Sequence, residues 1–415
     1  MLSFKKNELY IENVKLSNIA KKYSTSTYVY SKQQIINNYN SYRKAMGSKD
    51  GLICFACKTN SNGNILKILA GLGAGADTTS GGEMYRCLKA GFNPSKIVYA
   101  GVGKTSEEIE YALESKIFMF NVESFEELDA INKIAGRLKT KANIAFRINP
   151  YVDPDTHSYI VTGKKGTKFG IPYEDAVKAY LTAKKKKNIS VVGIHSHIGS
   201  QILEVEPFVV AAKKIKKIVD EVEKNGIHIN YIDCGGGLGI KYEKGEKVSS
   251  PKHLMSEIFP VFDKDKKFIF EPGRSIIGDA GHLLTKVLYR KMSGKKNFLI
   301  TDAGMNDLIR PTLYDAYHEI IPVKKSNAKK VKSDVVGPIC ESGDFMGKDR
   351  MLPIVEQGEY LLVTCVGAYG AAMSSEYNSR PLLAEVLVDG KQAKVIRKRA
   401  SYKDLMLNEI LYRFL

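Results

Sequence analysis

The chain has 415 residues, of which 44% are apolar, and 63 Lys and Arg against 45 Asp and Glu give a formal charge of +18. This composition excludes a disordered protein, and the length excludes a small scaffold that depends on disulfides. At roughly 100–200 residues per domain, we expect either two domains or one barrel with an appended domain.

The sequence gives no sign of a membrane or of secretion. No run approaches the ~18 consecutive apolar residues that cross a bilayer, and no apolar leader segment follows the first residues. The six cysteines are scattered through the chain, which is typical of a reducing compartment. We therefore expect a cytoplasmic protein that does not contact membranes.

The positive charge is spread along the chain and is dense only at residues 184–187 and 213–217. Apolar residues around the second run recur at helical spacing, so its lysines belong on a solvated helix face. A basic RNA-binding protein is the alternative of a different class. It would need clustered Lys and Arg interleaved with aromatic residues, and the sequence shows no such stripe, so we expect no nucleic-acid partner.

Short apolar runs alternate with amphipathic stretches between about residues 50 and 280. The runs that predict strands are 52–56, 75–78, 97–100, 117–122, 142–148, 191–197, 229–234 and 267–270. The stretches with helical spacing are 61–70, 82–90, 105–114, 126–135, 173–186 and 207–224. This alternation predicts an α/β fold with an eight-stranded TIM-type β/α barrel. An open doubly wound sheet is the alternative, because periodicity alone does not close a barrel.

The pattern changes after Arg274, where strand-like runs follow one another without helices. They are residues 282–289, 297–301, 360–365, 382–388 and 394–397. We therefore predict a barrel domain over residues 30–280 and a second, β-rich domain formed by residues 1–29 and 281–415.

Reactive groups of a β/α barrel lie at the carboxyl ends of its strands. Lys58 follows the first run; an isolated lysine is usually a surface cation, but a desolvated one can form a Schiff base with an aldehyde. His195 and His197 end the sixth run and would share one face of a strand. They could be hydrogen-bonded core residues, metal ligands or an imidazole stacked on a flat ring. No third ligand of suitable spacing follows, so we expect no metal.

The last two runs end in loops suited to an anion. Gly235, Gly236 and Gly237 follow the seventh run and expose backbone N–H groups that could hold a phosphate. Glu271 and Arg274 flank a Pro-Gly turn after the eighth run, where a structural ion pair is the alternative. A lysine, a histidine, phosphate loops and a strand-end glutamate together are what a pyridoxal phosphate enzyme needs.

On these residues the chain resembles the fold-type III pyridoxal phosphate-dependent decarboxylases, and among them the diaminopimelate decarboxylase family. The resemblance runs nearly end to end. The motifs that carry it are the segment around Lys58, Gly75 to Glu83, His197 to Gln201, Gly235 to Gly237, Glu271 to Arg274, Arg310 to Tyr314, Cys340 to Asp344 and Gly367 to Tyr369.

The resemblance implies a role for each matching residue. Lys58 is the Schiff-base lysine, His197 stacks on the cofactor ring and Glu271 contacts the pyridine nitrogen. Cofactor contacts are further implied for Asp77, Ser200, Gly235, Gly236, Gly237, Gly273, Arg274 and Tyr369, and substrate contacts for Arg274, Arg310, Tyr314, Glu341 and Tyr369.

The reaction implied is the decarboxylation of meso-2,6-diaminopimelate to L-lysine and CO2. Cys340 is the candidate general acid, because a thiol with the usual pKa of about 8.5 is largely protonated at neutral pH. Arg310 and Glu341 would supply the opposite charges that the distal amino and carboxylate groups need. Decarboxylases of ornithine, arginine or carboxynorspermidine are the nearest alternatives. The family resemblance also implies a homodimer in which the two subunits share active sites.

Overall fold

The computed structural model describes residues 2–153 and 166–411. The chain divides into two compact units, each described here by itself. The β-rich unit comprises Met1–Ile35, Lys241–Glu246 and Ile277–Leu415, and the barrel unit comprises Ile36–Ile240 and Lys247–Ile276.

A ring of eight parallel strands forms the centre of the barrel unit. The strands are β5 (Gly51–Ala56), β6 (Gly75–Thr78), β7 (Ile97–Tyr99), β8 (Met119–Val122), β9 (Ala142–Asn149), β11 (Ile189–His195), β12 (Tyr231–Asp233) and β13 (Lys267–Phe270). Each strand pairs with the next, and the pairing of β13 with β5 closes the ring. The short strand β10 (Ile171–Pro172) adds to β9 outside the ring. The predicted closed barrel is confirmed, and the open sheet is excluded.

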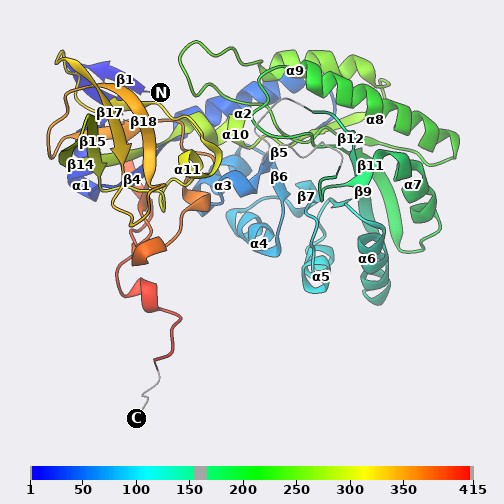
Figure 1. Cartoon of the computed structure of the whole chain (residues 1–415). Coiled ribbons are helices and arrows are strands. Elements are labelled where there is room, and N and C mark those ends of the chain that lie inside the picture. Colours follow the sequence, from blue (N-terminus) through cyan, green and yellow to red (C-terminus); the bar gives the residue numbers. More distant parts are fainter. Residues whose placement is uncertain (1, 154–165, 412–415) are drawn as a thin grey trace. The chain divides into compact units, whose positions relative to one another are not determined.

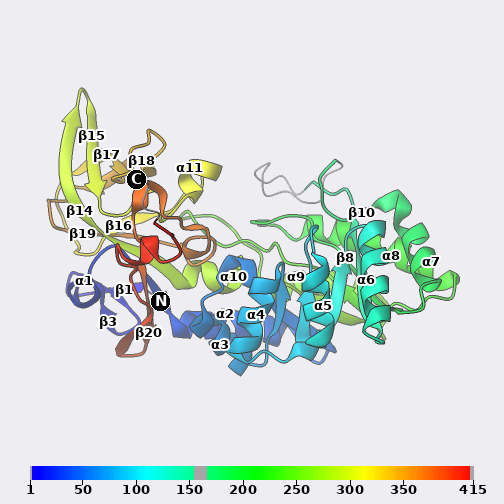
Figure 2. The same ribbon diagram turned by 90° about the horizontal axis from the view of Figure 1, so that it is seen from below.

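Helices connect the strands and pack beside one another outside the ring (Figures 1 and 2). They are α2 (Lys32–Met46), which begins in the β-rich unit, α3 (Gly63–Gly71), α4 (Gly81–Ala90), α5 (Ser106–Glu114), α6 (Phe125–Arg137), α7 (Ala176–Lys184), α8 (Glu206–Lys224), α9 (Pro251–Ile258) and the short α10 (Arg274–Ile277). A serine or threonine followed three residues later by glutamate starts three of them. The side chains of Ser80, Thr105 and Ser124 each accept from the backbone N–H of that glutamate. Such caps satisfy N–H groups that the first turn of a helix leaves without a partner.

Apolar side chains fill the inside of the barrel. Cys54, Val98, Met119, Ala145 and Ile269 come from five different strands and form one buried cluster. A barrel of this size is filled by side chains and is not a pore. The polar groups that follow the strands therefore lie above a dry, packed floor.

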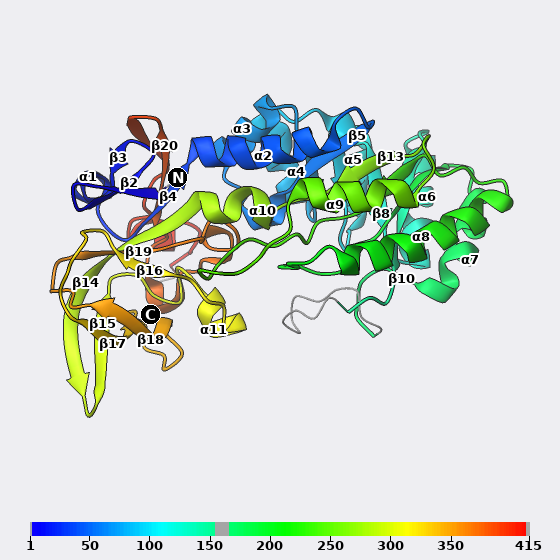
Figure 3. The ribbon, with the colours of Figure 1, turned by 90° about the horizontal axis from the view of Figure 1, so that it is seen from above.

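The β-rich unit is built on a sheet whose path runs β18–β17–β15–β14–β4–β20–β21, with β19 on β14 and β16 on β19. The strands are β4 (Thr27–Ser31), β14 (Gly281–Ser293), β15 (Lys296–Thr301), β16 (Ile320–Pro322), β17 (Lys330–Val336), β18 (Phe345–Pro353), β19 (Tyr360–Val363), β20 (Ala384–Asp389) and β21 (Gln392–Arg397). Strands β14 and β15 form a long antiparallel hairpin (Figure 3).

Smaller elements complete this unit. Strands β1 (Leu2–Lys5), β2 (Glu8–Ile11) and β3 (Val14–Lys15) form a separate sheet next to helix α1 (Leu16–Tyr23), and α11 (Arg310–Tyr314) follows β15. Ile11, Ile19, Val29, Leu284 and Val386 belong to one buried cluster. The amino-terminal segment therefore shares its core with strands from the last third of the chain.

The carboxylate of Asp302 ties the start of β4 to β14. It accepts from Thr25 Oγ1 and Ser26 Oγ at 2.6 Å each, from Thr285 Oγ1 at 2.7 Å and from Lys286 N at 2.9 Å. Hydrogen bonds to a charged group make a net contribution of about 1.5–3 kcal/mol each. Thr25 and Ser26, the polar residues before β4, therefore have a structural role.

Several elements differ from the sequence prediction. The sequence prediction does not include helices α2 and α9 or strands β17 and β18, because their polar residues hide the apolar period, and it does not include β16, which is only three residues long. Strand β11 ends at His195, so His197 lies beyond it, and the expectation that both histidines share a strand face is wrong. Among the described residues, no helix is both long and apolar enough to span a membrane.

Candidate active site

Lys58 lies in a single turn, Cys57–Thr59, that follows β5 directly. Its Nζ is 3.1 Å from Oδ2 of Asp77, which lies on the neighbouring strand β6. Asp77 is fully buried, whereas the Lys58 side chain is 36% exposed. A reagent can therefore reach the lysine amine while the carboxylate stays fixed beneath it.

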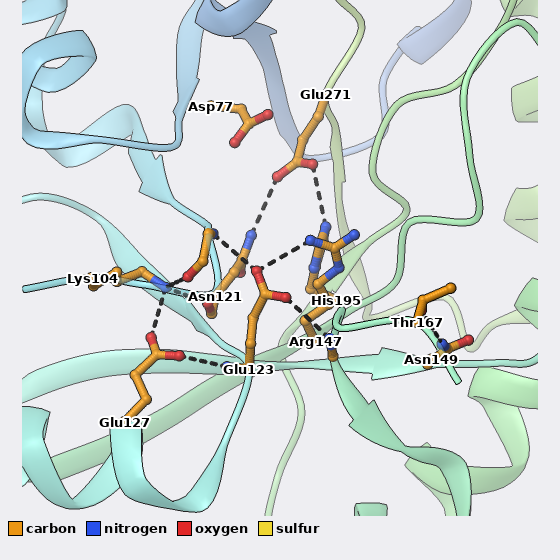
Figure 4. A network of polar contacts seen from close by, with 12 residues as sticks. Asp77, Lys104, Asn121, Glu123, Glu127, Arg147, Asn149, Thr167, His195 and Glu271 are labelled. Atoms are coloured by element: carbon orange, nitrogen blue, oxygen red, sulfur yellow. Dashed lines mark hydrogen bonds and ion pairs between the residues drawn. The ribbon is translucent and has the colours of Figure 1, made fainter. Parts of the chain in front are cut away.

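Two other strands bring polar groups to Glu271, which follows β13 (Figure 4). His195 Nε2 on β11 is 3.2 Å from Glu271 Oε2, and Asn121 Nδ2 on β8 donates to Glu271 Oε1 at 3.3 Å. The same amide lies 3.4 Å from Asp233 Oδ2 at the end of β12. All four side chains are buried.

These neighbours give the two acids opposite charge states. Burial alone would raise the pKa of Glu271, but the charge and hydrogen bond of His195 and the charge of Lys58 outweigh it and lower the pKa to about 2. Burial and the negative charge of Glu271 raise the pKa of Asp233 well above its usual value. Of the two carboxyl groups, Glu271 therefore carries the charge.

His197 and Asp77 are shifted as well. Burial and the nearby charges of Lys58 and Arg147 lower the pKa of His197, so its ring is neutral at pH 7. Burial and the charge of Glu271 raise the pKa of Asp77 to about 7, although Lys58 opposes this shift. Strongly shifted groups gathered at the ends of barrel strands are typical of an active site.

Close backbone packing requires glycine in the loop after β12. Gly235 and Gly237 have φ values of +63° and +119°. A Cβ atom would lie 2.6 Å from Ser196 O at Gly235, 2.2 Å from Glu271 O at Gly236 and 2.6 Å from Gly199 O at Gly237. His197 belongs to this packing, because its Nδ1 accepts from Gly236 N at 3.1 Å. The loop thus presents backbone without side chains beside His197 and Glu271.

Gly273 and Arg274 extend this surface after β13. A Cβ atom at Gly273 would lie 2.4 Å from Thr59 Cγ2, in the turn that carries Lys58. Arg274 Nη2 is 3.2 Å from Ser200 Oγ. A guanidinium, a hydroxyl and glycine backbone together suit a phosphate group.

A second set of buried charges surrounds Glu123 (Figure 4). Arg147 Nη1 and Gly101 N donate to its Oε1 at 3.1 and 2.9 Å, and Gly170 N donates to its Oε2 at 3.0 Å. Lys104 Nζ binds Asn121 O at 2.9 Å and Glu127 Oε1 at 2.6 Å. This set holds the backbone of β8 and so the position of Asn121.

The sequence prediction missed Asn121, Glu123 and Arg147. Each is a polar residue in or directly after an apolar strand, in Phe120-Asn121-Val122-Glu123 and Phe146-Arg147-Ile148. The strand-end argument that selected Lys58 and Glu271 would have found them if it had been applied to these two runs.

The remaining predicted site residues lie in the β-rich unit. Arg310 and Tyr314 are on α11, Cys340 and Glu341 lie between β17 and β18, and Tyr369 follows β19. Cys340 is exposed. The substrate and cofactor roles of these five residues stay predictions.

Two buried atoms of the barrel unit bear on the cofactor. Within residues 2–153 and 166–411, Asp77 Oδ1 and His195 Nδ1 have no hydrogen-bond partner. Buried polar atoms without partners are rare in folded proteins. Together with a reachable lysine, an ionised carboxylate and a glycine surface, they fit the pyridoxal phosphate expected from the sequence.

His195, Asp233 and Glu271 also form a set of metal-type ligands whose atoms lie within 4.8 Å of one another. Their oxygens and the His195 Nε2 already bond to each other, to Asn121 and to Gly235 N. We interpret the set as an acid–imidazole cluster, and the absence of a metal stays a prediction.

Comparison with known proteins shows that this chain is similar to decarboxylases. The family described as "Pyridoxal-dependent decarboxylase, pyridoxal binding domain" matches residues 32–278. Diaminopimelate decarboxylase from Aquifex aeolicus is 51% identical over 402 residues, covering 97% of this chain and 95% of the relative.

Solved structures agree over the whole fold. Diaminopimelate decarboxylase from Helicobacter pylori complexed with L-lysine matches with a TM-score of 0.92 and 43% identity, covering 95% of this chain and 99% of that chain. The enzyme from M. jannaschii in co-complex with L-lysine matches with a TM-score of 0.95 and 40% identity, covering 99% and 98%. This chain therefore belongs to the diaminopimelate decarboxylase family of pyridoxal phosphate-dependent enzymes.

Proposed function

We propose that this chain decarboxylates meso-2,6-diaminopimelate at its D-configured carbon and releases L-lysine and CO2, the last step of lysine biosynthesis. The observation that carries the proposal is the placement of Lys58 beside Asp77, above a barrel of the diaminopimelate decarboxylase family. L-Lysine bound to two related enzymes is the expected product, and this supports the choice of substrate.

The residues that would hold pyridoxal phosphate come mainly from the barrel unit. Lys58 would carry its aldehyde carbon on Nζ, and the ring would lie against the neutral imidazole of His197. The phosphate would be bound by Ser200, Gly235, Gly236, Gly237, Gly273 and Arg274, with Tyr369 from the β-rich unit. When bound, the cofactor supplies a protonated ring that accepts the electron pair left by the departing carboxylate.

Glu271 would keep a proton at the pyridine nitrogen. Only an ionised carboxylate favours that proton, and His195 and Asn121 hold Glu271 in this form. A carboxylate buried this deeply would otherwise take up the proton itself. Through Glu271, this cluster would control how strongly the bound ring accepts electrons.

The β-rich unit would bind the rest of the substrate. The substrate contacts implied by the family resemblance are Arg310, Tyr314, Glu341 and Tyr369 of this unit, together with Arg274 of the barrel unit. Arg310 would pair with the distal carboxylate and Glu341 with the distal amino group. Cys340 would return a proton to the carbon that has lost CO2.

A homodimer with shared active sites completes the proposal. Lys58 belongs to the barrel unit, whereas the exposed Cys340 belongs to the β-rich unit. The family resemblance assigns the two residues of one active site to different subunits. Two-fold symmetry would then create two equivalent sites per dimer.

The first test concerns Lys58. Borohydride reduction of the cofactor-loaded protein followed by peptide mapping should label Lys58, and Lys58→Ala should lose turnover and the label while remaining folded. Lys217→Ala, an exposed lysine on α8, is the matched control and should keep both. Label on any other lysine would contradict the assignment.

Asp77 predicts a pH dependence of stability in the cofactor-free protein. Its pKa is raised to about 7 in the folded state. The stability that protonated Asp77 contributes is therefore fully present below the usual aspartate pKa and is lost as pH rises through about 7. Asp77→Asn removes this loss. The free energy of unfolding of the variant, relative to that of wild type, should therefore rise by at least about 1.4 kcal/mol between pH 5 and pH 8, the equivalent of one pKa unit.

Urea unfolding of both proteins across this pH range measures the difference. Asp129→Asn, at a side chain that is 62% exposed, is the control and should follow wild type. A constant difference between Asp77→Asn and wild type would show that Asp77 has no raised pKa.

Glu271→Gln should bind cofactor but lower kcat by at least about a hundredfold, since a neutral amide cannot favour the protonated ring. Cofactor absorbance reports binding, and CO2 release reports kcat. Glu257→Gln, an exposed position on α9, should behave as wild type. Unchanged turnover in Glu271→Gln would refute the role of this carboxylate.

Mixing two inactive variants tests the shared site. If Lys58→Ala and Cys340→Ala subunits exchange at random, about half of the dimers are mixed and each holds one intact site, so about a quarter of wild-type sites should recover. Lys58→Ala mixed with the Lys58→Ala, Cys340→Ala double variant is the control and should recover none. No recovery after proven exchange would place both residues in the site of one subunit.

A further inference from the structure

Buried groups of the β-rich unit hold Arg310 from two sides. Arg310 Nη1 donates to Tyr242 Oη at 3.0 Å and lies 2.9 Å from His318 Nε2. The guanidinium carbon also lies 5.0 Å from the centre of the Tyr242 ring. Arg310, Tyr242 and His318 are all buried, and His318 is fully so.

The partners of His318 determine which of its nitrogens carries hydrogen. Nδ1 is 2.8 Å from the carbonyl oxygen of Thr364, which can only accept a hydrogen bond. Arg310 Nη1 can only donate, so Nε2 must accept. His318 is therefore the neutral tautomer with hydrogen on Nδ1, and its Nε2 lone pair faces the guanidinium.

This arrangement fixes the rotation of the guanidinium plane. Nη1 has two hydrogens, and Tyr242 and His318 take one each. His318 is itself anchored to the sheet at two points. Its partner Thr364 directly follows β19, and β16, which starts two residues after His318, pairs with β19. The Tyr242 and His318 rings pack edge to face, with centroids 5.2 Å apart.

We propose that His318 is a positioning residue for substrate choice: with Tyr242, it holds the Arg310 guanidinium in the one orientation that binds the distal carboxylate of the substrate. The inference rests on the proposed function of Arg310. Bidentate binding of a carboxylate depends on the plane of the guanidinium, so loss of the Nε2 acceptor should weaken ligands that carry this carboxylate.

Substituting His318 by asparagine or by glutamine tests its two hydrogen bonds separately. Asparagine can replace Nδ1 and keep the bond to Thr364 O, but it does not reach Arg310. Glutamine places its oxygen near the Nε2 position and can keep the bond to Arg310. A merely structural role, in which His318 only anchors the loop to Thr364, predicts the opposite order of effects.

The experiment uses the cofactor-loaded protein and two probes, L-lysine and cadaverine, which is lysine without its carboxyl group. His318→Asn should raise the Kd of L-lysine and the KM of diaminopimelate by about tenfold or more, with a smaller change in kcat and a cadaverine Kd within about twofold of wild type. His318→Gln should retain an L-lysine Kd within about threefold of wild type.

Tyr242→Phe should raise the Kd of L-lysine by a smaller factor than His318→Asn does, because the ring stays while the hydroxyl is lost. Tyr289→Phe, at an exposed tyrosine of β14, is the control and should change neither probe. If His318→Asn does not fold, His318→Gln and Tyr242→Phe still test the proposal. Equal L-lysine affinity in Asn and Gln variants, parallel weakening of both probes, or unaltered L-lysine binding in Tyr242→Phe would overturn it.

Arg310→Gln separates this inference from the proposed function. Suppose that Arg310→Gln weakens the binding of L-lysine but not of cadaverine, while His318→Asn changes the binding of neither probe. The positioning role of His318 is then wrong, and the assignment of Arg310 stands. If Arg310→Gln also leaves L-lysine binding unaltered, the proposed substrate contact of Arg310 is itself wrong.

Discussion

An ionised carboxylate buried inside the barrel is the constraint on which the rest of this site depends. Burial opposes the charge of Glu271, and the protein offsets it with His195 and Asn121 from two other strands. Lys104, Glu123 and Arg147 then hold β8 and the strand beside it. In its proposed role, the charge of Glu271 would therefore depend on side chains from three other strands, β8, β9 and β11.

Backbone packing imposes a second constraint. The loop after β12 approaches the turn after β11 and the end of β13 so closely that a Cβ atom at Gly235, Gly236 or Gly237 would meet backbone. Glycine there both permits the fold and leaves N–H groups uncovered for an anion. The barrel thus positions the proposed phosphate site by main chain, which tolerates less movement than side chains do.

The two units divide the proposed chemistry. The barrel unit carries groups whose pKa values are shifted by burial, which suits control of the cofactor. The β-rich unit carries Arg310, held by neutral partners, and the exposed Cys340 and Glu341. In the proposed function, the acids and histidines of the barrel would control how the cofactor reacts, and the orientation of one guanidinium in the β-rich unit would control which substrate is accepted.

The sequence alone predicted the eight strands of the barrel, because each is a short apolar run, but it left ring closure open and did not reveal the polar helices α2 and α9. It also located Lys58, the glycine loop and Glu271, since the groups that end barrel strands face one side. Their partners can be identified only from the three-dimensional fold. Asn121 meets Glu271 from 150 positions away, and Thr364 fixes the tautomer of His318 from 46 positions away. Such pairings arise from ring closure and sheet order, and no local period in the sequence records them.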